Sequence, residues 1–297
     1  MSSKDLTMGV VYLTQTVVGI LGNVCFLYHC LWRSRPIDFI LKHLMLANSL
    51  VFLSKGVTQT MASLGLKLFL SDAGCKVIFY VHKVGRGVSI STTCLLSVFQ
   101  AIMISPRSSR WAEHKAKAPK YVGISVSLCW SLNMMLNSTV VLYVTGKLGK
   151  KNLTRKRDFG HCYVEFLDEI TDSLNTVLVS IPDVFCLGLM LWASSNMVFI
   201  LHRHKQQVQY IHRTSVSCQS APETRATQSI LVLVSTFVSF YTLSFIFHIY
   251  FSVVNHSSFW LVNTSVLTSA CFPTVSPFVL MSRDSSKPSK CCQWEMK

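Results

Sequence analysis

The sequence predicts an all-α membrane protein: a seven-transmembrane helix bundle with its N-terminus outside and its C-terminus inside. Of the 297 residues, 50% are hydrophobic and only 14% are charged, whereas soluble domains carry about 25% charged residues. The apolar residues form long blocks with the charges at their junctions, which is typical of helices in lipid. Lys and Arg are distributed unequally between the two sides that these blocks define. A soluble enzyme, a nucleic-acid-binding protein and a disordered chain are therefore poor interpretations.

Seven blocks are long enough to cross ~30 Å of hydrocarbon at about 1.5 Å per residue. They cover residues 8–32, 44–64, 77–104, 121–144, 176–201, 227–254 and 259–281, so that residues 1–297 form one membrane domain. We expect residues 145–168 to form an outer loop that covers the bundle as a lid, and residues 282–297 to form a cytoplasmic tail. The first block is too long for the apolar region of a signal peptide, so we expect it to remain as a membrane anchor.

The basic residues determine the predicted orientation. Most of the 28 Lys and Arg residues lie in the junctions after the first, third and fifth blocks and in the C-terminal tail. Since cytoplasmic segments carry the excess of positive charge, this side faces the cytoplasm. The net charge of +15 is therefore mainly a topology signal and does not indicate a nucleic-acid partner.

Motifs of enzymes are not evident in the sequence. It contains no phosphate-binding Walker loop, no His-Glu-x-x-His helix and no Gly-x-Ser-x-Gly turn. We therefore expect no catalytic site, no metal and no cofactor. Internal repeats are not visible either, which weakens a transporter interpretation without removing it.

Two cysteines and one sequon carry predictions for the outer face. Cys75 lies at the outer end of the third block and Cys162 lies in the long outer loop, both on the oxidising side, so we expect a disulfide between them. Asn152 is the Asn-x-Ser/Thr site that lies well clear of the membrane, and we expect it to be glycosylated. Cys291 and Cys292 follow the last block. At this position the sequence is compatible both with palmitoylation and with an unmodified tail.

The third block contains the group His82-Lys83-x-x-Arg86, which is unusual inside a membrane span. Ionisable side chains at this depth cost several kcal/mol unless they are paired or hydrated, so they indicate a cavity. Helical spacing places these three residues on one broad face with Phe79 and Ile90. We expect this face to bind a polar or anionic ligand.

Two alternatives at this site stay open. Arg86 could instead form a fixed ion pair with Asp183 of the fifth block, whereas Lys83 has no evident partner. Lys55 in the second block could reach the same cavity or extend toward the membrane surface. In the sixth block, spacing places Phe240 and Tyr241 on the side facing the cavity, although packing is the more common role of such aromatic residues.

Several landmarks resemble those of rhodopsin-like G-protein-coupled receptors. Gly22-Asn23, Trp130, Pro182 and Pro277 occur in the corresponding spans. The sequence departs from the usual pattern at Asn48, where an Asp is common, and at Phe99-Gln100-Ala101, which replaces Asp-Arg-Tyr. An opsin is excluded because the last span contains no lysine for a Schiff base.

These departures match one family. The stretches HLMLANSLVFLSKGVTQTM (43–61), KVGRGVSISTTCLLSVFQAIMISPR (83–107) and CFPTVSPFVLM (271–281) resemble vomeronasal type-1 receptors. The resemblance implies a multi-pass plasma-membrane receptor of chemosensory neurons that binds small chemosignals and activates an inhibitory-class heterotrimeric G protein. From the basic residues of the third block, we expect an anionic or steroid-like chemosignal. The resemblance does not imply which chemosignal.

This architecture implies a cytoplasmic cleft that receives the G protein. We expect its lining to include Gln100, Ile104, Arg107, Arg203 and Lys205, although basic residues here also serve topology and binding to anionic lipid. Two other classes remain as alternatives: a bitter-taste-type receptor, which shares several of the departures, and a membrane transporter or channel.

Overall fold

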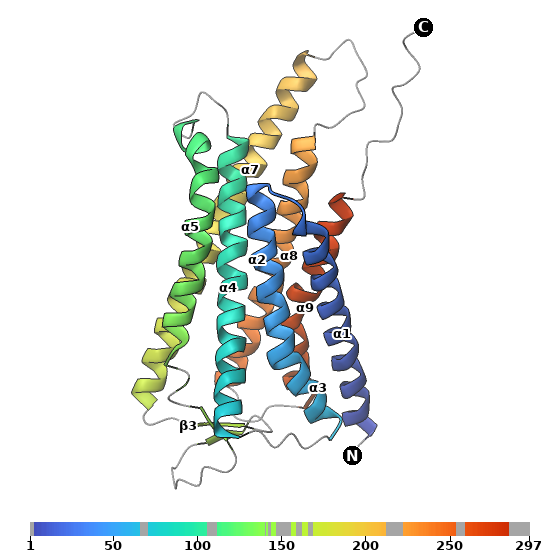
Figure 1. Ribbon diagram of the computed structural model, residues 1–297, viewed down its shortest axis with the longest axis vertical. Coiled ribbons are helices and arrows are strands. Elements are labelled where there is room, and N and C mark those ends of the chain that lie inside the picture. The colour runs from blue at the N-terminus through green and yellow to red at the C-terminus, as the bar shows by residue number, and fades with distance from the viewer. Residues whose placement is uncertain are drawn as a thin grey trace.

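The computed structural model describes residues 3–65, 71–105, 112–139, 141, 144–146, 156–158, 162–165, 169–211, 222–253 and 259–284. These residues form an elongated bundle of helices with a small sheet at one end (Figure 1). We call this end the sheet end. Helix α1 begins at the sheet end, and α9 finishes at the opposite end (Figure 1).

The first part of the chain forms two long rods. Helix α1 covers Ser3–Leu31, and the second rod consists of α2 (Pro36–Val51), the π-helix η1 (Phe52–Gly56) and α3 (Val57–Ser63). Proline suits the first turn of a helix, since it needs no amide donor there. The second rod therefore starts at Pro36, whereas the predicted span starts at residue 44. Polar residues at the beginning of α2 conceal this part of the helix in the sequence.

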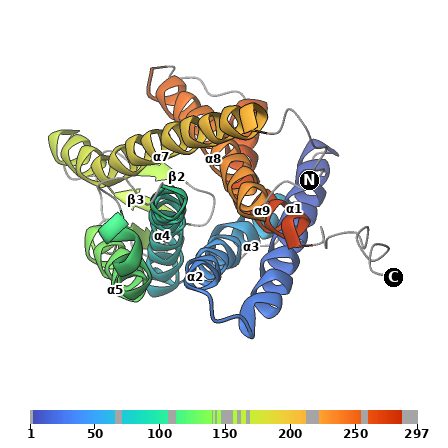
Figure 2. The same ribbon diagram turned by 90° about the horizontal axis from the view of Figure 1, so that it is seen from above.

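Helix α4 covers Asp72–Ile104 and is the central element. Its start is capped by the Ser71 side chain, which accepts a hydrogen bond of 3.2 Å from the amide of Gly74. It contacts α2, η1, α5, α7, α8 and β1. Seen from above, α4 lies between α2 and α5, with α1 and α9 beyond α2 (Figure 2).

The remaining helices are α5 (Ala112–Asn137), α7 (Glu169–Ile211), α8 (Pro222–Val253) and α9 (Phe259–Asp284). Pro119, Pro182, Pro273 and Pro277 lie inside these helices. Helix α5 ends at Asn137 rather than at residue 144, where the predicted block ends, because Val144 begins a strand.

Three strands at the sheet end were not part of the all-α prediction. They are β1 (Val144–Gly146), β2 (Lys156–Asp158) and β3 (Cys162–Glu165), which pair antiparallel in the order β1-β3-β2. Strand β1 contacts α4. These strands are the described part of the predicted lid over residues 145–168.

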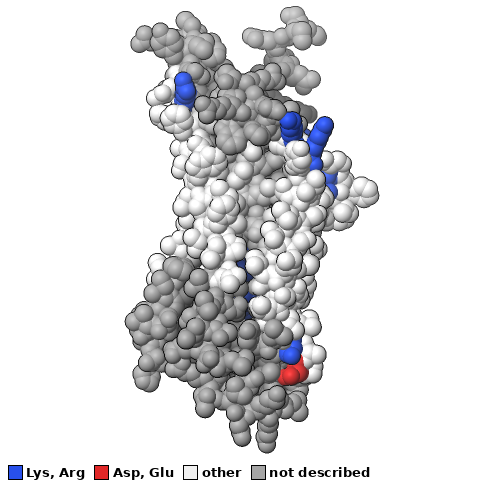
Figure 3. All heavy atoms as spheres, turned by 90° about the vertical axis from the view of Figure 1, so that its left-hand side faces the viewer, with Lys and Arg blue, Asp and Glu red and all other residues white. Residues whose placement is uncertain are grey.

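Five helical stretches of the described chain are long and apolar enough to span a membrane: Leu6–Leu31, Pro36–Ser63, Asp72–Ile104, Ser180–Arg203 and Asn263–Ser282. A shorter apolar stretch, Ile230–Ser244, lies in α8. One face of the molecule carries a broad uncharged belt, with Lys and Arg near its upper end and basic atoms recessed in a narrow opening within the belt (Figure 3). Exposed apolar side chains such as Trp32, Met135 and Phe199 suit contact with lipid.

Candidate functional site

The ionisable residues predicted for the third span all lie on α4, and they divide between two cavities. His82, Lys83 and Arg86 are each partly buried. One cavity is lined by His82, and the other by Lys83 and Arg86. Ile90 is 2% exposed and belongs to the hydrophobic core instead.

The first cavity lies among α4, α5 and α7, and we call it the Lys83 cavity. Its lining residues are Lys83, Arg86, Gly87, Asn133, Leu136, Asn137, Pro182 and Asp183. Its volume is about 30 Å³, which is room for roughly two water molecules. A larger ligand therefore requires the surrounding helices to separate.

A chain of contacts joins three of the helices at this cavity. The Tyr241 hydroxyl of α8 donates a hydrogen bond of 2.5 Å to the carboxylate of Asp183 on α7. The guanidinium of Arg86 lies over the Tyr241 ring, 5.2 Å from its centre, in cation–π geometry. Tyr241 thus connects Arg86 to Asp183 indirectly, and these two described residues form no ion pair with each other.

The charge balance of this layer is positive. Lys83 and Arg86 both act electrostatically on Lys55. Asp183 is the carboxylate that acts on Lys83, and it already accepts the hydrogen bond from Tyr241. The Lys83 ammonium has no hydrogen bond or ion pair to any described residue, so it is available to an anion.

Helix α5 contributes a wall of this cavity that was not among the predicted site residues. Asn133 donates 3.1 Å to Ser91 and 2.8 Å to the Cys129 carbonyl. Asn137 donates 2.9 Å to the Asn133 carbonyl, and its buried Oδ1 has no partner among the described residues. Two asparagines four residues apart in an apolar helix share one face, a signal that could have indicated this wall.

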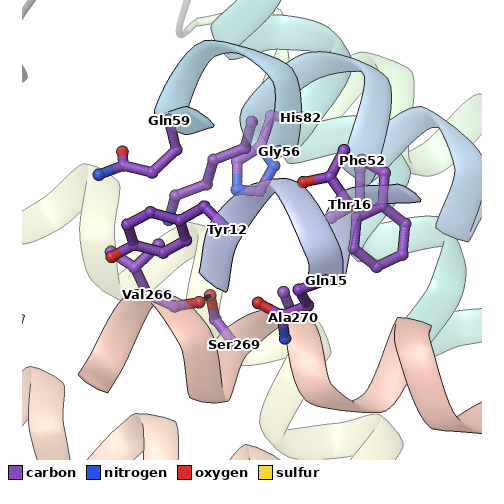
Figure 4. Close-up of a pocket in the computed structure, with 12 residues that line it drawn as sticks. Tyr12, Gln15, Thr16, Phe52, Gly56, Gln59, His82, Val266, Ser269 and Ala270 are labelled. Atoms are coloured by element: carbon purple, nitrogen blue, oxygen red, sulfur yellow. Dashed lines mark hydrogen bonds between the residues drawn. The ribbon is translucent and has the colours of Figure 1, made fainter. Parts of the chain in front are cut away.

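The second cavity lies among α1, α4, α9 and the rod of α2, η1 and α3. We call it the His82 cavity, and its lining residues are Tyr12, Gln15, Thr16, Val51, Phe52, Lys55, Gly56, Gln59, His82, Val266, Ser269 and Ala270. Tyr12 and Gln59 lie on one side of this space and Phe52 on the other (Figure 4). Lys55 therefore lines a cavity that shares no lining residue with the Lys83 cavity.

The other residues predicted for the ligand site lie at different depths. Phe240 and Tyr241 are partly buried and pack against the hydrophobic core. Phe79 is partly buried on α4. Neither Phe79 nor Phe240 lines the two cavities.

A buried polar network connects α2, α4 and α9 on the side of these cavities that faces away from the sheet end (Figure 1). Asn48 accepts a hydrogen bond of 2.7 Å from Ser89 and donates one of 2.9 Å to Ser276. Asn23 of α1 donates 3.0 Å to the Pro273 carbonyl, while its buried Oδ1 has no partner among the described residues. The position that is commonly an Asp is thus filled by a neutral side chain whose two polar atoms both have partners.

The residues expected to contact a G protein lie toward the end opposite the sheet. Gln100 is 7% exposed, and Ile104 is partly buried at the end of α4. Arg203 of α7 is exposed. Arg107 and the side chain of Lys205 lie outside the described part of the chain.

The predictions for the outer loop fall partly outside the described residues. Cys75 is fully buried at the start of α4 and is disulfide-bonded. Strand β3 begins at Cys162 and pairs with β1, which contacts α4. The side chain of Cys162 is not described, so its pairing with Cys75 stays a prediction. Asn152 also lies outside the described residues.

Five long apolar helical stretches in the described part of the chain define its class: it is a multi-pass helical membrane protein. Residues 6–292 match the vomeronasal organ pheromone receptor family. The chain belongs to this family of chemosensory membrane receptors, which confirms the resemblance seen in the sequence.

Individual relatives agree with this assignment. The chain is 53% identical to human vomeronasal type-1 receptor 4 over 301 aligned positions, covering 99% of this chain and all of the relative. It is 54% identical to human vomeronasal type-1 receptor 2, covering 94% of this chain and 72% of the relative. A more distant relative, olfactory receptor class A-like protein 1 of Danio rerio, is 32% identical over 92% of this chain and 88% of the relative.

Proposed function

We propose that the protein is a seven-transmembrane chemosignal receptor of the plasma membrane, with its N-terminus outside, that binds small molecules carrying an anionic or strongly polarised oxygen. The sheet end is the outer end in this proposal. The proposal rests on one observation. The Lys83 ammonium lines a cavity and has no partner among the described residues. The carboxylate of Asp183 acts electrostatically on Lys83, but it already accepts a hydrogen bond from Tyr241.

The chemistry of the cavity supports a specific ligand class. A carboxylate, a sulfate or a polarised carbonyl can accept charge-assisted hydrogen bonds from Lys83 and Arg86, each contributing ~1.5–3 kcal/mol. An amine ligand would meet like charges that repel it in a low dielectric. The rest of the ligand should be apolar, because Leu136 and Pro182 line the cavity and the Tyr241 ring lies next to Arg86.

The experiment compares ligands that differ only in charge. The receptor is expressed at the cell surface and screened with carboxylate, sulfate and neutral analogues of one apolar or steroid scaffold. We expect anionic members to act at roughly 10- to 100-fold lower concentration than neutral ones, which corresponds to one charge-assisted contact. Equal potency of neutral and anionic analogues would contradict the proposal.

We further propose coupling to an inhibitory-class heterotrimeric G protein at the end opposite the sheet. Support comes from the exposed basic residue Arg203 on a helix that continues to Ile211, beyond the apolar stretch that ends at Arg203. Neutralising Arg203 and Lys205 together should reduce agonist-induced inhibition of adenylyl cyclase while surface level stays constant. Unchanged coupling in a correctly inserted variant would restrict these residues to lipid contact.

A further inference from the structure

The His82 cavity contains two nitrogen-bearing groups that the proposed function does not use. The Lys55 ammonium has no hydrogen bond or ion pair to a described residue, although it lines the cavity. Nδ1 of His82 is buried and likewise lacks a partner in the described part of the chain. Buried polar groups are normally satisfied, so the unpartnered Nδ1 of His82, in the same small space as the Lys55 ammonium, indicates a missing partner.

Several polar neighbours of these two groups are engaged elsewhere. The Tyr12 hydroxyl donates 2.7 Å to Asn263, and the Gln15 amide donates 3.1 Å to the Leu267 carbonyl of α9. Ser269 donates 2.7 Å to the Val266 carbonyl. The positive charge at this cavity therefore comes from Lys55, beside the ring nitrogen of His82, which suits an anion rather than a cation.

The π-helix η1 determines where Lys55 points. A π turn accommodates one extra residue, which changes the direction of side chains within it relative to a regular α-helix. Helix α1 packs tightly against this turn: an added Cβ at Gly19 would clash with the Phe52 ring, and one at Gly56 would lie 2.8 Å from Thr16 Oγ1. This close packing fixes the turn and holds Lys55 at the cavity.

The surrounding charges also require a counter-ion. Lys83 and Arg86 both repel Lys55 and each other, whereas the carboxylate of Asp183 acts on Lys83. The layer therefore carries more positive than negative charge within a membrane-spanning bundle, which is costly unless it is compensated.

We propose that the His82 cavity binds one small monovalent anion, of the size of chloride, between the Lys55 ammonium and the His82 imidazole. The cavity has a volume of about 30 Å³, room for roughly two water molecules. This space fits a monatomic anion without any separation of the surrounding helices. The anion would be a structural counter-ion that stabilises the α1–α2–α4–α9 side of the receptor.

Thermal unfolding of the purified full-length receptor tests this site. Tm is measured while chloride replaces gluconate at constant potassium and constant ionic strength. We expect chloride to raise Tm saturably by about 2–4 °C, because an ion that binds only the folded state stabilises it. Lys55→Gln should abolish this shift in Tm. Lys120 is an exposed residue of α5, so Lys120→Gln serves as the control and should keep the shift.

Two further variants keep the test decisive if Lys55→Gln does not fold. Lys55→Arg preserves the charge and should preserve the chloride shift, and His82→Asn should raise the half-saturating chloride concentration roughly tenfold. The proposal is overturned if chloride does not raise the Tm of the wild-type receptor. It is also overturned if wild type, Lys55→Gln and His82→Asn show the same Tm shift and the same half-saturating chloride concentration. Lys83→Gln should keep the shift, so failure here is distinguishable from failure of the chemosignal site.

Discussion

At the residue scale, Gly87 in the wall of the Lys83 cavity has no room for a side chain. A Cβ added there would clash with Oδ1 of Asn133, whose amide is held by hydrogen bonds to Ser91 and Cys129. We expect Gly87→Ala to destabilise the receptor by about 1–3 kcal/mol through overpacking, measured as a lower Tm and lower surface expression.

Two variants serve as controls for Gly87→Ala. Gly188 has no atom within 4 Å of an added Cβ, so Gly188→Ala should be neutral or slightly stabilising in its helix. Asn133→Ala removes the clashing side chain and should partly restore the Gly87→Ala receptor. Equal effects of the two glycine substitutions would show that α4 and α5 are not as close as the structure places them.

The Asn48 network gives a second prediction at this scale. Ser89 and Asn48 share a buried hydrogen bond of 2.7 Å between α4 and α2. A double-mutant cycle of Asn48→Ala and Ser89→Ala should therefore give a coupling energy of about 0.5–1.5 kcal/mol in unfolding. Strictly additive effects on the free energy of unfolding would contradict a direct bond.

The grouping of these residues around separate cavities was not predictable from the sequence. Helical spacing placed His82, Lys83, Arg86 and Ile90 on one broad face of α4. Because α4 is surrounded by other helices, different parts of that face meet different neighbours, and only Lys83 and Arg86 share a cavity. Spacing along one helix cannot tell which neighbours pack against it, so Lys55 and Asn133 could not be assigned to their cavities.

At the element scale, the π-helix η1 supports a deletion experiment. Leu53 is 56% exposed within this turn. Deleting it should yield a continuous α-helix in which α2 and α3 still present the same sides to their neighbours. We expect the receptor to reach the cell surface but to lose the chloride shift in Tm, because Lys55 changes direction.

Deletion of Leu46 is the matched control. Leu46 is 42% exposed in the regular helix α2, where removing one residue rotates everything that follows by about 100°. This variant should fail to reach the surface. If both deletions have the same effect, the extra residue in the π turn η1 can no longer be regarded as an insertion that is removable without rotating α3.

The existence of the long helices was predictable because hydrophobic blocks of membrane-spanning length dominate the sequence. Their ends were less predictable. The polar start of α2 concealed the helix from Pro36 onward, and the end of α5 at Asn137 was assigned too late because the apolar stretch continues into β1. The π turn leaves no signal in residue spacing, since its sequence FLSKG is not distinctive.

At the scale of the whole molecule, the outer loop should act as a disulfide-fixed lid. Cys75 is buried and disulfide-bonded, and β3 begins at Cys162 in a sheet that contacts α4. Replacing either cysteine by Ser should lower surface delivery and chemosignal response together. Removing a native disulfide costs about 2–5 kcal/mol in small secreted domains.

Peptide mapping under non-reducing conditions identifies the bond directly. A peptide pair linked through Cys75 and Cys162 is the expected result. Free thiols at both positions, or a linkage of Cys75 to a different cysteine, would show that another segment closes the outer end.

The central claim is that Lys83 recognises the negative charge of a chemosignal. The most direct measurement is the pair of concentration–response curves for an anionic agonist and its neutral analogue on wild-type and Lys83→Gln receptors, at matched surface expression. Lys76→Gln, nearer the start of the same helix, is the control. We predict that Lys83→Gln weakens the anionic agonist by roughly 10- to 100-fold and spares the neutral analogue. Equal loss for both ligands, or no loss for either, would contradict the claim.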